Sequence, residues 1–150
     1  MARHVLQGQS SNYRIDQIDR AHIMLLRIHH AAIICAHYET SKRFYTETLG
    51  LKVLAEHYRA ARNSYKLDLA LPDGSQIELF SFDNAPPRPS YPEAQGLRHL
   101  AFAVADVAQC KAMLESKGVA VEDVRVDEYT GRRFVFFADP DDLPLELYEA

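Results

Sequence analysis

The stretch HAAIIC at residues 30–35 returns in outline as HLAFAV at residues 99–104. Each copy is followed by a second apolar run that carries one glutamate, IELF at 77–80 and LELY at 145–148. Glu78 comes 48 positions after His30, and Glu146 comes 47 positions after His99. A fixed internal period predicts that two copies of one structural unit build the fold.

Both copies predict the same order of elements, a strand, a helix and three further strands. Alternating apolar runs predict the strands, and apolar residues at helical spacing that end at a glycine predict the helices. The predicted strands are 25–35, 52–59, 64–71, 76–82, 97–104, 119–126, 132–138 and 144–148, and the helices are 38–49 and 107–117. The predicted fold class is α+β, with tandem βαβββ modules whose sheets form a half-barrel around a cavity.

The chain length fits one domain made of two small modules. We assign module one to residues 24–83, a proline-rich linker to 84–96 and module two to 97–150, because PPRPSYP within the linker suits neither a helix nor an interior strand. Residues 1–23 stand outside the repeat. They are interpreted as an N-terminal extension, a tag or a mis-called start, since Met24 is a natural first residue.

The composition excludes several classes of partner. A hydrophobic content of 47% and a charged content of 25% are ordinary for a soluble globular protein. The net charge of −4 argues against nucleic acid and anionic membrane surfaces, which select an excess of Lys and Arg. No apolar run approaches the roughly 20 residues that span a bilayer. Two cysteines without a secretion signal predict a reduced, cytoplasmic protein.

The repeat places His30, Glu78, His99 and Glu146 at equivalent points of two copies. Any one of them alone fits the polar face of a half-exposed strand, but the matched set favours convergence on one divalent ion. Two imidazoles and two carboxylates suit Zn, Ni, Co, Mn or Fe, and we expect Zn or Ni first. Such a set leaves coordination positions open for a small-molecule substrate.

Three arginines are weaker candidates for substrate binding. Arg59 and Arg62 belong to a basic cluster that suits an anionic substrate group, although a solvated hairpin explains them better. Arg133 shares one strand face with Val135 and Phe137, and the other face carries Phe134 and Phe136. We expect these two phenylalanines to pack against the helix at 107–117 and Arg133 to point toward the cavity.

The chain resembles the vicinal oxygen chelate superfamily, the group of glyoxalase I, bleomycin-resistance proteins and extradiol dioxygenases. The resemblance rests on SKRFYTETLGL at 41–51, IELF at 77–80, RHLAFAV at 98–104 and FADPDDLPLEL at 137–147. It covers nearly everything from Met24 to Ala150. Asp142 stands where the family usually has glycine, so that turn must accept a side chain.

The resemblance implies a function as well as a fold. Fosfomycin-modifying enzymes and extradiol dioxygenases are expected to lack a ligand at the place of Glu78, and related epimerases carry glutamine there. The four-residue set is therefore similar to that of glyoxalase I, and the chain looks closest to short bacterial glyoxalase I-like proteins.

By this resemblance the protein is a metal-dependent lyase, similar to lactoylglutathione lyase. It isomerises a small thiol adduct of an α-oxoaldehyde through an enediolate, with Glu146 as the first choice for the base and Glu78 as the second. A homodimer is implied. An epimerase, a dioxygenase, a thiol transferase and a metal-dependent binding protein without turnover stay open as alternatives.

Overall fold

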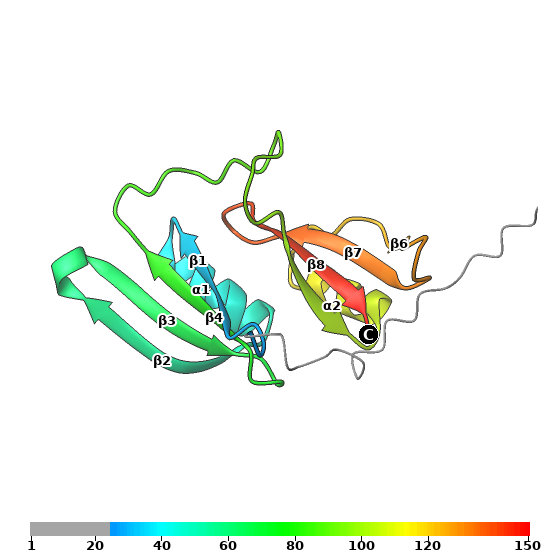
Figure 1. Ribbon diagram of the computed structural model, residues 1–150, viewed down its shortest axis with the longest axis horizontal. Coiled ribbons are helices and arrows are strands. Elements are labelled where there is room, and N and C mark those ends of the chain that lie inside the picture. Colours follow the sequence, from blue (N-terminus) through cyan, green and yellow to red (C-terminus); the bar gives the residue numbers. More distant parts are fainter. Residues whose placement is uncertain (1–24) are drawn as a thin grey trace, which may run out of the picture.

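The computed structural model describes residues 25–150, and the extension proposed for residues 1–23 lies outside the described part. Two four-stranded sheets make up the fold (Figure 1). In the first sheet the strand order is β1 (His30–Cys35), β4 (Gln76–Ser81), β3 (Ser64–Ala70) and β2 (Lys52–Arg59). In the second sheet it is β5 (Leu100–Val104), β8 (Pro144–Glu149), β7 (Arg133–Ala138) and β6 (Arg125–Val126). The predicted α+β class with two βαβββ modules is confirmed.

The pairing is the same in both sheets. The first strand of each module runs parallel to the last one, β1 beside β4 and β5 beside β8. The remaining neighbours are antiparallel. Because β1 and β5 are edge strands next to β4 and β8, the histidine of each module comes beside the glutamate of the same module.

The helices depart from the prediction in one detail. The segment expected as one helix at 38–49 is an α-helix, α1 (Tyr38–Arg43), that continues as a π-helical turn, η2 (Phe44–Thr48). The second helix, α2 (Val107–Ser116), begins after Asp106, whose carboxylate accepts a hydrogen bond from the Gln109 amide at 3.0 Å. A short 3₁₀ turn, η3 (Ala60–Arg62), joins β2 to β3. No helix between residues 25 and 150 is long and apolar enough to cross a membrane.

The strand predicted at 119–126 is largely wrong. Only Arg125 and Val126 pair with β7, and one further bridge joins Val121 to Phe137. Glu122 and Asp123 interrupt the apolar pattern of this segment, and Lys111 satisfies two of its carbonyls, those of Val121 and Glu122. A side chain from α2 therefore takes the place of a backbone ladder here.

One hydrophobic core joins the two modules. Each sheet turns one face toward the helices, and the buried side chains of both modules belong to a single cluster, whose members include Leu67, Leu69, Ile77, Leu79, Val107, Leu114, Val135, Leu145 and Leu147. The other face of each sheet is open and carries the predicted His and Glu ligands, so the fold separates a packed side from an open side.

Polar contacts also tie the modules together. The fully buried Tyr45 of η2 donates a hydrogen bond to Asp139 Oδ2 at 2.9 Å, and burial raises the pKa of this aspartate. Lys117 Nζ donates to the carbonyls of Glu47 and Thr48, each at 2.8 Å, at the end of η2. These contacts lie between elements of different modules, and they fix the two repeats against each other.

The turn before β8 accepts a side chain as expected. Asp142 has a φ of +63°, in the left-handed region, and its amide donates to the carbonyl of Asp139 at 3.1 Å. Asp139 also accepts hydrogen bonds from the amides of Asp141 and Leu143, both at 2.9 Å. From the linker, Ser90 Oγ donates to the Asp142 carbonyl at 2.7 Å, which anchors this crossing segment over module two.

Candidate metal centre and its surroundings

The first predicted pair lies on the open face of the first sheet. His30 begins β1, and Ala32 is the residue of β1 directly opposite Glu78 on β4. His30 and Ala32 share a face, so the imidazole lies diagonally across from the carboxylate. His30 Nε2 and Glu78 Oε2 are 3.6 Å apart. The carboxylate is largely buried, with 16% of its side chain exposed, while the imidazole is open to solvent.

The second pair repeats this arrangement. His99 directly precedes β5, whose Ala101 lies opposite Glu146 on β8. His99 Nε2 and Glu146 Oε2 are 3.0 Å apart, and only 10% of the Glu146 side chain is exposed. The His99 ring meets Phe136 edge-on, with ring centroids 5.1 Å apart. Each module therefore places one imidazole nitrogen beside one carboxylate oxygen.

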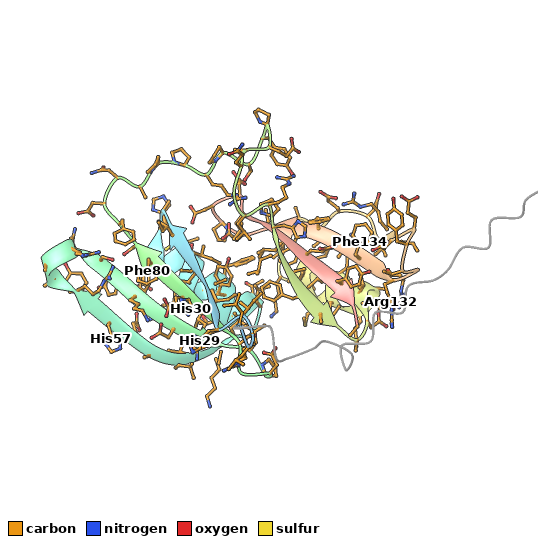
Figure 2. All side chains as sticks on the ribbon, in the orientation of Figure 1. His29, His30, His57, Phe80, Arg132 and Phe134 are labelled. Carbon is orange, nitrogen blue, oxygen red and sulfur yellow. The ribbon has the colours of Figure 1, made fainter. Side chains whose placement is uncertain are left out.

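A single chain does not bring the two pairs together. Among residues 25–150, no group of three or more His, Cys, Asp or Glu side chains is close enough to hold one ion. The pairs lie on separate sheets, which form separate halves of the molecule in Figures 1 and 2. Each histidine lies beside the glutamate of its own module, and the joining of all four stays a prediction.

The donor atoms fit a divalent metal. Two ligand atoms bound to one ion at bond lengths near 2.1 Å lie about 3.0 Å apart at a right angle and about 3.4 Å apart in a tetrahedron. The observed separations of 3.0 and 3.6 Å are close to these values. Imidazole nitrogen and carboxylate oxygen also form the mixed donor set that Zn, Ni, Co, Mn and Fe accept.

The two glutamates have different surroundings. Glu78 Oε1, the oxygen that faces away from His30, is 3.1 Å from Lys66 Nζ, and Lys66 also contacts Asp68. These hydrogen bonds, chiefly the one that Lys66 donates to Asp68, raise the pKa of Lys66 and keep its ammonium charged. Within the described chain, Glu146 has no ion-pair partner other than His99. Glu78 is therefore held by a second charged group, whereas His99 is the one ionic partner of Glu146 among the described residues.

The predicted orientation of β7 is wrong. Phe136 lies opposite Glu146 and Phe134 opposite Tyr148 in the β7–β8 register, so both phenylalanines share the open face with the second His–Glu pair. Val135 and Phe137 are buried in the core instead. An aromatic wall therefore stands beside His99 and Glu146, a position that the sequence analysis had assigned to the helix-packed face.

The predicted orientation of Arg133 toward the cavity is wrong for the same reason. It shares the face of Val135, and its guanidinium pairs with Glu149, with Nη2–Oε1 at 2.6 Å. Arg133 in turn lowers the pKa of Glu149 to about 2 through these hydrogen bonds. The guanidinium thus already has a carboxylate partner on the opposite face from Glu146, which removes the basis for assigning it to the substrate.

The two remaining arginine candidates lie in different parts of the first module. Arg59, the last residue of β2, lies on the open face of the first sheet, where its guanidinium covers the ring of Phe80 with Cζ 5.0 Å from the ring centroid. Arg62 lies in the exposed η3 turn and makes no side-chain hydrogen bond or ion pair to any described residue. Only Arg59 faces the same side as a predicted metal-binding pair.

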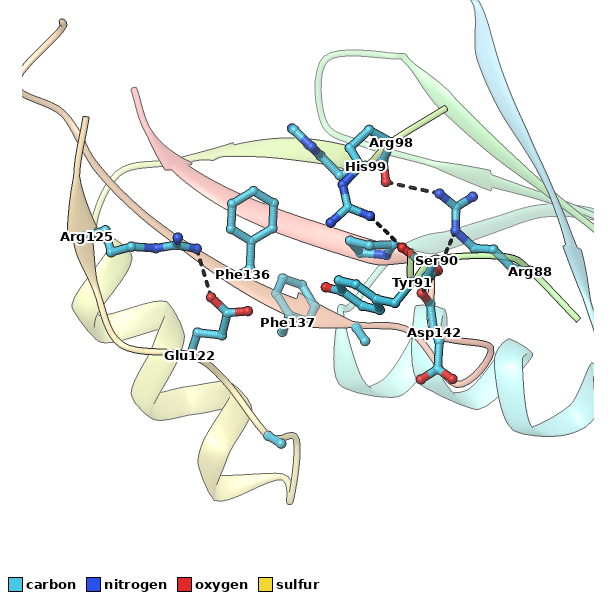
Figure 3. A pocket seen from close by; sticks show the side chains of 13 residues that line it. Arg88, Ser90, Tyr91, Arg98, His99, Glu122, Arg125, Phe136, Phe137 and Asp142 are labelled. Carbon is cyan, nitrogen blue, oxygen red and sulfur yellow. Dashed lines mark hydrogen bonds and ion pairs between the residues drawn. The ribbon is translucent and has the colours of Figure 1, made fainter. Parts of the chain in front are cut away.

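A cavity of about 700 Å³ lies along the open side of the second module. Its lining includes His99 and Phe136 and three cations, Arg88, Arg98 and Arg125. Figure 3 shows Arg88 and Arg98 at one end and Arg125, paired with Glu122, at the other. The cavity gives a small molecule access to His99 and to Phe136. No motif in the sequence singled out Arg125, although it lies in the segment predicted as a strand at 119–126.

Comparisons with known proteins agree with this architecture. Residues 27–147 match the Glyoxalase/Bleomycin resistance protein/Dioxygenase superfamily, which confirms the resemblance inferred from the sequence motifs. The uncharacterized protein YaeR of Escherichia coli (strain K12) is 57% identical over 125 residues, covering 83% of this chain and 97% of its own length.

Two solved structures have the same fold. The glyoxalase family protein from Enterococcus faecalis is 48% identical, with a TM-score of 0.79 over 85% of this chain and 100% of that one. The trypanothione-dependent glyoxalase I of Leishmania major is 27% identical, with a TM-score of 0.65 over 83% of this chain and 87% of that one. The likeness therefore extends across nearly the whole described chain.

Proposed function

Because the chain belongs to the Glyoxalase/Bleomycin resistance protein/Dioxygenase superfamily, we propose that it is a divalent-metal-dependent lyase of the glyoxalase I type. Its substrate is a small thiol adduct of an α-oxoaldehyde, which it isomerises to a 2-hydroxy thioester through an enediolate. The observation that carries this proposal is the pair of matched His–Glu sets, with donor atoms 3.6 and 3.0 Å apart. The likeness to a glyoxalase I at 27% identity supports it.

The proposed site consists of His30, Glu78, His99 and Glu146. A divalent ion bound there supplies Lewis-acid stabilisation to oxygen atoms of the substrate that gain negative charge. Zn or Ni is the first expectation for this donor set.

Proton transfer is assigned to Glu146. The base must take a proton from the carbon beside the substrate carbonyl and return one to the neighbouring carbon. Glu146 suits this role because it has no second ion-pair partner within residues 25–150, whereas Lys66 holds Glu78 at 3.1 Å. Phe134 and Phe136 provide an apolar wall on the same face and exclude water from the reacting carbons.

The two cysteines have no part in this chemistry. Both are free, and Cys35 is buried, which raises the pKa of its thiol to about 11. Such a thiol stays protonated and unreactive at neutral pH. Free cysteines and a thiol-adduct substrate are both consistent with the reduced cytoplasm as the proposed location.

A homodimer is proposed to complete the site. The described chain holds one His–Glu pair on each of two separate open faces, and an isologous dimer brings unlike faces together twice. His30 and Glu78 of one protomer then share an ion with the partner's His99 and the partner's Glu146. Ile34, which is 55% exposed on the open face of β1, gains cover from such an interface.

We expect light scattering at micromolar concentration to give a mass close to twice the 17.1 kDa of one chain. A sharper test co-expresses two variant chains, His30→Ala and His99→Ala, each of which lacks one metal ligand and cannot form a complete site by itself. Random pairing in a dimer with shared sites rebuilds about a quarter of the sites, because one site of each mixed dimer keeps all four ligands. A monomer mass, or no recovery of bound metal in the mixture, contradicts the shared site.

The proposed reaction is tested by assay with methylglyoxal and different thiols. We expect thioester formation with Zn or Ni, loss of turnover after removal of the metal by a chelator, and recovery when the ion is returned. Oxygen consumption or epimerisation in place of thioester formation indicates another metalloenzyme of the superfamily. Tight metal binding without any turnover indicates a binding protein.

A further inference from the structure

Arg59 lies on an aromatic shelf beside the first His–Glu pair. Its guanidinium covers Phe80 and Phe82, with Cζ 5.0 and 5.6 Å from the ring centroids. Phe80 is two residues beyond Glu78 on the same face of β4, which corresponds to about 7 Å along the strand. The guanidinium therefore stands on the open face, within the length of a small molecule from the proposed ion.

This guanidinium makes little use of its donors. A guanidinium has five N–H groups. Among the described residues, Arg59 makes one side-chain hydrogen bond, from Nη2 to the buried Ser64 Oγ at 2.9 Å; its Nε is buried without a hydrogen-bond partner, and no hydrogen bond is made by Nη1. No carboxylate in residues 25–150 forms an ion pair with it. The two rings and Ser64 hold the group in place, yet its charge is not balanced by any described neighbour.

The other arginines on or near the open faces differ in this respect. Arg125 pairs with Glu122 at 2.8 Å and Arg133 pairs with Glu149. Arg88 donates to the carbonyls of Leu97 and Arg98, and Arg98 donates to Ser90 and Glu93. Arg125 also lies on two aromatic rings, those of Phe134 and Phe136, but its charge is balanced by Glu122. Arg59 combines a fixed position on an open face with a charge that no carboxylate in the described part of the chain balances.

We propose that Arg59 binds a carboxylate of the substrate. A fixed, planar guanidinium matches the two oxygens of a carboxylate, and its place on aromatic rings lowers the entropy that binding costs. The substrate is then an oxygen-chelating molecule whose free carboxylate lies about 7 Å from the chelating end. This inference rests on the proposed function only for the end of the ligand that meets the metal.

The test compares two hydroxamates on the zinc-loaded protein by titration calorimetry. Glutaric acid monohydroxamate and pentanohydroxamate share a chain length and a metal-binding end, and they differ in a terminal carboxylate or methyl group. We expect the carboxylate probe to bind about tenfold more tightly to the unmodified protein, as for one charge-assisted hydrogen-bonded pair. Arg59→Met should abolish this difference, and the matched control Arg62→Met should preserve it.

Equal binding of the two probes to the unmodified protein overturns the role of Arg59 and leaves the metal site intact. So does a preference for the carboxylate that survives in Arg59→Met. If pentanohydroxamate does not bind at all, the proposed metal site is wrong. The Nε–H resonance of Arg59, followed in the unmodified protein during titration with glutarate, then decides: a saturable shift supports the carboxylate site, and an unchanged resonance overturns it.

Discussion

Replacement of Glu146 by glutamine is expected to lower turnover by about a thousandfold, within the range for loss of a general base. The amide keeps the size of the side chain and an oxygen that can still face the ion, but it cannot accept the substrate proton at neutral pH. The measurement is the initial rate of thioester formation at saturating metal, together with the metal content of the variant.

Glu78→Gln is the matched control, since Glu78 occupies the equivalent point of the other module. Lys66 holds the carboxylate of Glu78 at 3.1 Å, and the neutral amide loses that charge-assisted contact as well as a charged metal ligand. We therefore expect this variant to lose metal affinity first and to regain much of its turnover when excess metal is added. Full turnover in Glu146→Gln, or an equal loss in both variants at saturating metal, contradicts the assignment of the base.

Replacement of His99 by alanine is expected to reduce bound metal to near zero while the protein stays folded. His99 precedes β5, and 36% of its side chain is exposed, so its removal opens no cavity in the core. Its loss leaves Glu146 without the nitrogen donor that lies 3.0 Å from it. Elemental analysis after dialysis against Zn or Ni measures the occupancy, and circular dichroism verifies the fold.

His57→Ala provides the control for this experiment. His57 lies opposite Lys66 in the β2–β3 register, on the same open face as Glu78, and the sequence repeat does not include it. This variant should keep the full metal content of the unmodified protein. Full metal content in His99→Ala, or an equal loss in His57→Ala, contradicts the four-residue set.

The repeat in the sequence was sufficient to predict both His–Glu pairs. A histidine that opens the first strand and a glutamate in the last strand become neighbours whenever those strands pair in parallel, as β1 with β4 and β5 with β8 do. Alternation along each strand then places both side chains on one face. These relations are local to one module, and a repeated pattern reports them directly.

The prediction that Phe134 and Phe136 pack against the helix was wrong because the sequence pattern does not distinguish the two faces of β7. Both faces of β7 are apolar, so hydrophobicity alone does not distinguish the core side from the open side. The short turn from Asp139 to Leu143 sets the β7–β8 register and puts Phe136 opposite Glu146. Counting residues back from Glu146 through this turn places Phe136 on the same face as Glu146. The relation between the two pairs lies beyond one chain's sequence pattern, because in the proposed dimer it depends on how copies associate.

The buried bond from Tyr45 to Asp139 has a consequence for either repeat on its own. It spans the two repeats at 2.9 Å within a shared core, so a solitary repeat presents that core to water. Joining both repeats in one chain holds the two complementary surfaces together at high effective concentration. The packed sides of the repeats thus depend on each other, whereas their open faces differ: one carries Lys66 and Asp68 where the other carries Phe134 and Phe136.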